Sequence, residues 1–356
     1  MSGEAGDNSL MDAPHVIVLL GGLLLIGAMG ADIFATLVVP QAPSRLRRLA
    51  PRLVEGVWRA WRWGARPIRD ADRRQRVLGL YGPLAVLLLT ALWAGGLPVG
   101  YSLVLLALPA QVRPPLTSPG TALYLSGTAL LTLGVGDSAT GGAARAVVRA
   151  EAASGLGLAA LVVTWLFTLQ SAFRQREALV LTLAARIGLP PAGATLLERY
   201  AHLGLLDTLP QDIAAWEARL AEVQESHLAY PILAHVRSRQ PVSWIGALGA
   251  LLDAATLVLT TVDTSATPGL RGSAQLLSDA ADPLVQGLRR DFALPPDEAP
   301  GPTRAEFEAT RRRLGAAGLP LTDGEGAWAA FRAQRVAYAG VLAALARYCA
   351  LPPDRT

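Results

Sequence analysis

The chain has 356 residues, of which 52% are hydrophobic and 17% are charged, and its mean hydropathy is +0.35. An average soluble domain carries roughly 25% charged residues, so this composition argues against a wholly soluble enzyme, and the high hydrophobic content excludes a disordered chain. The net charge is +4, and the single cysteine, Cys349, excludes an intrachain disulfide and a cysteine-based metal site.

The first apolar run covers residues 16–39 and is long enough to cross a hydrocarbon layer of ~30 Å. The tail before it is acidic, whereas a signal peptide begins with basic residues, so we predict a membrane-spanning helix. Asp32 interrupts the run. Two interpretations stay open for it: a hydrated acid near the interfacial end of the span, or an intramembrane partner of another helix.

An arginine-rich segment follows at residues 45–76, with eleven arginines against three acidic residues. Trp58, Trp61 and Trp63 lie within it. Arginine interleaved with tryptophan occurs in nucleic-acid-binding proteins, but between two apolar runs it is more typical of the cytoplasmic face of a membrane. We therefore expect membrane lipids rather than nucleic acid as the partner, and an extracellular N-terminus.

Two further spans are predicted. Residues 77–109 suffice for one tilted helix that runs outward, in which Pro98 can introduce a kink. Residues 152–172 contain no charge and are followed by Arg174 and Arg176. Basic residues at this end place the remainder of the chain in the cytoplasm.

The segment between these two spans, residues 116–140, has a pattern of its own. Residues 122–131 are apolar or small and would rise about 15 Å as a helix, which is half of a bilayer. The residues after them are Thr132, Leu133, Gly134, Val135, Gly136 and Asp137. Carbonyl groups of successive residues can replace the water shell of a cation when the backbone alternates in hand, which glycine permits at two of these positions. We expect a re-entrant loop, with the threonine hydroxyl adding an oxygen at the inner end.

Residues 123–137 resemble the pore helix and selectivity filter of potassium channels, in which the filter is usually Thr-Val-Gly-Tyr-Gly-Asp. Residues 77–172 resemble the outer-helix, pore-loop, inner-helix unit of two-transmembrane bacterial channels, with Arg145 and Gly155 where that family has an arginine starting the inner helix and a hinge glycine. The resemblance implies ion binding by residues 132–137, gating at Gly155 with Gly157, and a homotetramer. It also implies potassium or another monovalent cation as the permeant species, with no other cofactor. Tight helix packing is the alternative role for the two glycines.

One departure from the family concerns the filter tyrosine, which is Val135 here. In the family, the tyrosine hydroxyl bonds to a tryptophan of the pore helix and holds the filter at its working width. The matching pore-helix positions here are Tyr124 and Leu125. Because both ends of this contact are missing, we expect cation conduction that favours potassium over sodium less strongly than a Gly-Tyr-Gly filter does.

Glu151 precedes the uncharged part of the third span. Two interpretations stay open for this acid. It can form an interfacial ion pair with Arg145 or Arg149, or it can brace the filter from behind.

From residue 175 onward the pattern indicates helices separated by breaks rich in proline and glycine. The expected helices are residues 176–187, 192–205, 210–225, 226–239, 242–262, 270–290, 303–317 and 326–351, with a linker at 290–303. Residues 244–262 are nearly all apolar, and we interpret them as the core helix of a bundle, with a fourth span as the alternative. His202, His227 and His235 have no acidic partners in register, so no zinc site is expected.

The sequence therefore predicts an all-α protein of the inner membrane with a channel unit, an extra N-terminal span and an α-helical cytoplasmic domain. Its expected parts are an extracellular tail and first span (1–40), an arginine-rich cytoplasmic loop (41–76), a pore domain (77–173) and the helical domain (174–356). The expected function is potassium-channel-like cation conduction, and no set of nucleophile and base indicates an enzyme. The alternative is a non-conducting membrane sensor or scaffold that retains the channel fold.

Overall fold

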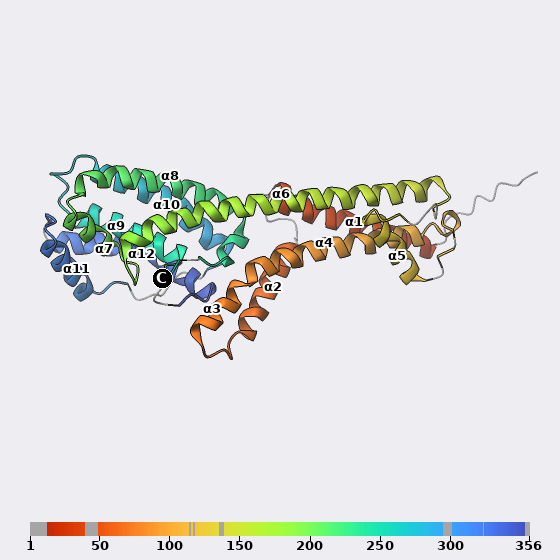
Figure 1. Cartoon of the computed structure of the whole chain (residues 1–356), viewed down its shortest axis with the longest axis horizontal. Helices are drawn as coiled ribbons and strands as arrows, with labels where there is room; N and C mark the ends of the chain where they lie inside the picture. The colour runs from red at the N-terminus through yellow and green to blue at the C-terminus, as the bar shows by residue number, and fades with distance from the viewer. Residues whose placement is uncertain are drawn as a thin grey trace, which may run out of the picture. The chain divides into compact units, whose positions relative to one another are not determined.

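The computed structural model describes residues 13–39, 49–113, 115–116, 118–134, 139–238, 240–294, 301–322 and 324–352. These residues form helices and connecting segments, with two isolated β-bridges and no strand among them (Figure 1). The chain divides into two compact units. The first unit consists of Met1–Arg59 and Pro83–Thr168, and the second of Ala60–Gly82 and Leu169–Thr356.

Three helical stretches are long and apolar enough to cross a membrane, and they confirm the three predicted apolar spans. The first is α1 (Ala13–Ile33), which continues as a π-helical turn over Phe34–Val38. The second comprises α3 (Ala71–Gly79) and α4 (Tyr81–Leu106), and the third is α6 (Gly142–Ile187). Helix α4 contains Pro98 in its interior and continues past it.

Helix α6 is longer than predicted. It runs for 46 residues, whereas we expected one helix over 152–172 and a separate one over 176–187. The charged residues that end the apolar run do not end the helix, because arginine and glutamate are good helix formers and residues 158–187 contain neither glycine nor proline. The helix stops at Gly188, whose φ of +71° lies in the left-handed region typical of the residue after a helix.

Glycines allow α1 to pack closely on α4 within the first unit. A β-carbon on Gly22 would lie 2.7 Å from the carbonyl oxygen of Gly100, and one on Gly100 would lie 2.8 Å from Cγ1 of Ile26. Gly96, one turn before Gly100, lies against Met29 in the same way. The spacing of the two α4 glycines is that of a GxxxG motif, in which missing side chains let two helix backbones approach.

Asp32 near the C-terminal end of α1 bonds to two other helices. It is only 4% exposed, and its Oδ2 accepts a hydrogen bond from Nε1 of Trp93 on α4 at 2.8 Å. Its Oδ1 accepts from the backbone N–H groups of Leu49 and Ala50, at 2.8 and 3.2 Å, which begin α2 (Leu49–Gly64). A carboxylate also suits the positive end of a helix dipole. The interpretation of Asp32 as a hydrated acid is therefore wrong, and it is a buried partner of other helices.

The second unit is a bundle around α9 (Trp244–Thr260), of whose 17 residues 15 are buried. The other helices of the bundle are α7 (Gly193–His202), α8 (Leu209–Ala229), α10 (Leu270–Asp291), α11 (Arg304–Ala316) and α12 (Gly324–Tyr348). Helix α9 packs against α7, α10 and α12. The one acid of α9, Asp253, forms an ion pair with Arg335 of α12 at 2.9 Å. The interpretation of this apolar segment as a core helix is confirmed, and a fourth span is not needed.

One predicted helix of this unit is wrong. We expected residues 226–239 to be helical, but α8 ends at Ala229 and only a 3₁₀ turn follows over Pro231–His235. Pro231 lacks a backbone N–H and disfavours the helical conformation of the residue before it. Tyr230 accordingly has a φ of −128° and a ψ of +78°. Apart from the helix merged into α6, the other predicted helices are present, with ends shifted by at most four residues.

The C-terminal end of α12 is held by side chains from elsewhere in the second unit. The carbonyl oxygens of residues 348, 349 and 350 accept hydrogen bonds from Arg62 of α2, Arg237 and Gln75 of α3, respectively. The last carbonyl groups of a helix have no partner within it and carry a partial negative charge, which cations stabilise. Residues 60–82 therefore belong to the second unit, although the sequence predicted a separate arginine-rich loop up to residue 76.

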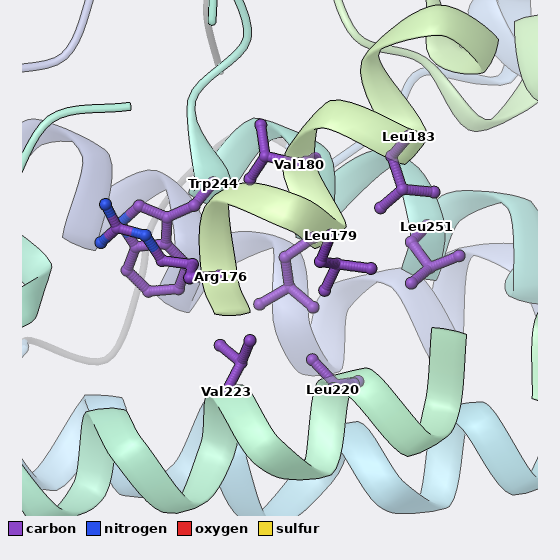
Figure 2. A pocket seen from close by; sticks show the side chains of 10 residues that line it. Arg176, Leu179, Val180, Leu183, Leu220, Val223, Trp244 and Leu251 are labelled. Atoms are coloured by element: carbon purple, nitrogen blue, oxygen red, sulfur yellow. The ribbon is translucent and has the colours of Figure 1, made fainter. Parts of the chain in front are cut away.

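A buried arginine lies in the part of α6 that belongs to the second unit. Arg176 is 1% exposed and donates hydrogen bonds to the carbonyl oxygens of Leu233 at 2.7 Å and Val236 at 2.8 Å. It also forms an ion pair with Glu177 at 3.3 Å. Figure 2 shows its guanidinium beside Trp244, next to leucine and valine side chains that line a cavity of about 20 Å³.

Two buried histidines make the stability of the second unit depend on pH. Burial lowers the pKa of His227 to about 3 and that of His235 to about 4, and nearby Arg176 and Arg237 lower them further by repulsion. Between these values and the ordinary pKa of about 6.5 the unfolded chain binds protons that the folded chain does not, so the free energy of unfolding falls as the pH falls. We expect a loss of about 2 kcal/mol per histidine between pH 7 and pH 5.

Urea denaturation of the purified chain at both pH values measures this loss. The double change His227→Leu and His235→Leu should remove most of it. His202 is exposed, so the matched change His202→Leu should leave the loss in place. An unfolding free energy that is equal at pH 7 and pH 5 would contradict the prediction.

Candidate functional site

A short helix, α5 (Pro119–Leu130), lies between α4 and α6 in the sequence, as predicted for residues 122–131. Ser118 caps it by accepting a hydrogen bond from the backbone N–H of Thr121 at 3.2 Å, and Pro119 occupies the first helical position, where its missing N–H does no harm. Twelve residues rise about 18 Å, which is little more than half of a hydrocarbon layer. Helix α5 therefore cannot cross a membrane by itself.

The C-terminal end of α5 leads into the predicted filter through a left-handed residue. The backbone N–H of Thr132 donates to the carbonyl of Ala129 at 3.0 Å, and that of Leu133 donates to Thr128 at 2.9 Å. These are the two hydrogen bonds of a Schellman motif, in which Thr132, with a φ of +55°, takes the position usually held by glycine. We had predicted left-handed residues only at the glycines, so this is a third such position.

Gly134 is left-handed as predicted, with a φ of +72°. The sign of φ is thus positive at residues 132 and 134 and not at Leu133 between them. All three residues are exposed in the single chain. The remaining predicted ion ligands, Val135, Gly136 and Asp137, lie outside the described residues, and their role stays a prediction.

Gln111 holds the two ends of the loop together. Its carbonyl oxygen accepts a hydrogen bond from the backbone N–H of Thr140 at 2.8 Å. Its side-chain Oε1 accepts from the backbone N–H groups of Ala143 and Ala144, both at 3.1 Å, and so caps the first turn of α6. Sequence reasoning missed this residue because the groups it caps lie more than 30 positions away and no local motif marks it.

Glu151 lies on α6 and is completely buried. Its carboxylate is hydrogen-bonded to the Ser126 hydroxyl of α5, which in turn lies 2.8 Å from the carbonyl oxygen of Pro98 on α4. A chain of three oxygen atoms, which we call the oxygen chain, therefore joins α6, α5 and α4. The interfacial ion pair is wrong, and Arg145 instead donates to the carbonyl oxygen of Ala139 at 2.9 Å. The alternative, a brace behind the predicted filter, is the one compatible with this geometry.

Tyr124 and Leu125, which the resemblance matches to the pore-helix tryptophan of potassium channels, have different surroundings. Leu125 is buried in an apolar cluster with Leu105, Val112 and Ala144, and this cluster anchors α5 in the first unit. Tyr124 is 67% exposed in the single chain. Val135, which stands at the filter end of the family's contact, lies outside the described residues.

The two glycines predicted as a hinge differ in their contacts. A β-carbon on Gly155 would overlap the carbonyl oxygen of Leu130, so α6 passes directly against the end of α5 at this point. No atom lies within 4 Å of the corresponding position on Gly157. Helix α6 is continuous through both residues. Gly155 thus has a packing role, and the gating hinge stays a prediction. A substitution at Gly157 tests the hinge without disturbing the packing of α5 on α6.

Gly155→Ala is expected to lower the thermal midpoint of the purified protein, because the added methyl group must displace α5. Gly157→Ala should leave the midpoint unchanged or raise it slightly, since alanine favours a helix over glycine by about 1 kcal/mol. Differential scanning fluorimetry of both variants measures the difference. Equal midpoints for the two variants would show that the close approach at Gly155 is not important for folding.

In the described ranges, no group of three or more histidine, cysteine, aspartate or glutamate side chains is placed to hold a metal ion. Comparison of the chain with protein-family models, with curated proteins and with solved structures finds no match. The class that the described residues define is an all-helical protein with three helices that could span a membrane. What can be said of its function rests on the short helix α5 and the residues around it.

Proposed function

We propose that the chain is a cation channel of the inner membrane that prefers potassium, and that four copies each contribute one loop to a shared filter. The observation that carries the proposal is the half-length helix α5, which leads into residues whose φ is positive at Thr132 and Gly134. The C-terminal end of a helix carries a partial negative charge that favours a cation. Alternation of hand lets successive carbonyl groups point toward one axis.

The supports around α5 fit the same function. A carbonyl filter replaces the water shell of an ion only if its oxygens are held in place. Gln111 fixes the two ends of the loop, and the oxygen chain fixes α5 against α4 and α6. Leu131 and Leu133, beside the predicted filter, are 65% and 70% exposed in the single chain. Contacts with neighbouring copies in a tetramer would cover such apolar side chains.

The proposed orientation places the arginine-rich helices α2 and α3 and the second unit in the cytoplasm. Arginines beside apolar spans favour the cytoplasmic side of a membrane. We expect the channel to favour potassium over sodium only moderately, because valine stands where the family has the filter tyrosine. The reversal potential of the purified protein in bilayers, with potassium on one side and sodium on the other, measures this preference.

Cation flux into liposomes that contain the purified chain tests the proposal. The wild type should pass potassium, and Gly134→Ala should abolish the flux because alanine does not readily adopt a φ of +72°. Gly127→Ala is the matched control, because Gly127 lies in α5 with no atom within 4 Å of an added β-carbon. Absence of flux from wild-type protein that is folded and tetrameric would favour the non-conducting sensor or scaffold instead.

A further inference from the structure

A groove of about 480 Å³ lies within the second unit, between α3 and the segment that leads into α9. Helix α3 contributes residues spaced so that they share one face, and Leu351 lies at the groove beyond α12. The residues that line it are Asp72, Gln75, Arg76, Gly79, Arg237, Ser238, Gln240, Ser243 and Leu351. Its volume is within the range of small-molecule sites, and only Gly79 and Leu351 among its lining residues lack a polar side chain.

Two arginines bring positive charge to the groove. The side chain of Arg237 passes beside Gly79, because a β-carbon on Gly79 would lie 3.2 Å from Cγ of Arg237. Arg76 lies one helical turn before Gly79, on the same face of α3. No carboxylate of the described residues forms a salt bridge with Arg76. The guanidinium of Arg76 is therefore suited to a phosphate, which it can bind with charge-assisted hydrogen bonds, and Arg237, whose guanidinium also donates to the carbonyl oxygen of Cys349, adds positive charge beside it.

The other lining residues indicate that the ligand is more than a phosphate. Asp72 can accept hydrogen bonds from hydroxyl or amino groups, and the amide of Gln240 can both donate and accept. Ser238 already donates to Glu177 at 2.7 Å, and Gln75 donates to the carbonyl of residue 350, so these two side chains serve the fold. An acid beside two arginines would repel inorganic phosphate but would bind the hydroxyl groups of a sugar.

We propose that this groove binds a phosphorylated small molecule of mononucleotide size, with the phosphate at Arg76 and Arg237 and a hydroxylated part at Asp72 and Gln240. Residues at this groove contact the chain at the end of the second unit's last helix, and several of them belong to the helix α3, which leads into α4. Arg237 and Gln75 donate to the carbonyl oxygens of Cys349 and Ala350, directly after α12, and α3 is separated from α4 by Leu80 alone. Occupation of the groove would therefore act on the helix that precedes a membrane span. The binding site itself does not depend on the proposed channel function.

Isothermal titration of the full-length chain in detergent with adenosine monophosphate, inorganic phosphate and adenosine tests the site. We expect adenosine monophosphate to bind most tightly, and added salt to weaken it. Arg76→Gln should weaken binding by about tenfold, the cost of one charge-assisted hydrogen bond. Asp72→Asn should weaken the binding of adenosine monophosphate, because it changes the acceptor for the sugar hydroxyl groups. It should strengthen the binding of inorganic phosphate, because it removes a repulsive charge.

Arg73→Gln is the matched control, since Arg73 is an exposed arginine of α3 that does not line the groove. It should bind adenosine monophosphate as the wild type does. The proposal is overturned if Arg73→Gln and Arg76→Gln weaken binding equally, if adenosine binds as tightly as its monophosphate, or if no probe binds at millimolar concentration. Because binding is measured directly, a failure here is distinct from an absence of cation flux.

Discussion

Glu151→Leu is expected to lower the cation flux of the reconstituted protein at least about tenfold, whereas Glu151→Gln should retain it. Leucine cannot bond to Ser126, so α5 loses its hydrogen-bonded connection to α6. Leaving the buried Ser126 hydroxyl without this partner costs about 1–3 kcal/mol, and a cost of about 2 kcal/mol reduces the population of correctly placed α5 by more than tenfold.

A count of hydrogen atoms makes the glutamine variant informative. The Ser126 hydroxyl has one hydrogen, yet its oxygen is within hydrogen-bonding distance of both the Glu151 carboxylate and the carbonyl oxygen of Pro98. A glutamine amide can donate to Ser126, which then donates to Pro98, so the oxygen chain is complete. If glutamine impairs flux as much as leucine does, the charge of Glu151 matters rather than the chain.

Amide hydrogen exchange of α5 measures how firmly Glu151 holds this helix, and the measurement does not depend on conduction. In Glu151→Leu the α5 amides should exchange faster than in the wild type, and in Glu151→Gln they should remain protected. Unchanged protection of α5 in the leucine variant would show that the oxygen chain does not hold this helix.

Arg176→Ala is expected to reduce the free energy of unfolding of the second unit by about 3–5 kcal/mol. The change leaves the carbonyl oxygens of Leu233 and Val236 without their donor in a buried place and removes a side chain that packs on Trp244. The main-chain turn after α8 depends on these bonds, because Pro231 ended the helix there. Urea denaturation followed by tryptophan fluorescence measures the loss.

The control for Arg176 lies two residues earlier on the same helix. Arg174 is exposed, so Arg174→Ala should change the free energy of unfolding by less than about 0.5 kcal/mol. A similar loss in both variants would mean that helix propensity or net charge, rather than the buried bonds of Arg176, governs the result.

The apolar helices could be predicted from the sequence because their signal is local. Three long apolar runs gave three helices of membrane-spanning length, and the run at residues 244–262 gave the buried helix α9. The short helix α5 was also predictable, since a run of ten apolar or small residues, 122–131, ends at a glycine-containing segment. Pro231 is a local signal too, because proline is incompatible with the helix predicted over 226–239.

The contacts that position these helices could not be predicted, because they join residues far apart in the sequence. Gln111 caps α6 across the whole segment that contains α5, and Asp32 bonds to Trp93, which lies 61 positions away in the sequence. The bond between Gln75 and the end of α12 spans 275 positions. A single sequence shows that Asp32 and Glu151 are acids in apolar surroundings, but it does not show which donors they meet.

The packing of α1 on α4 has a consequence for attempts to shorten the protein. Removal of residues 1–48 would leave a chain with two of its three apolar helices of membrane-spanning length. It would also uncover the glycine face of α4 at Gly96 and Gly100 and deprive Trp93 of its carboxylate. Bare GxxxG faces associate with one another in membranes, so truncated copies would pair through α4.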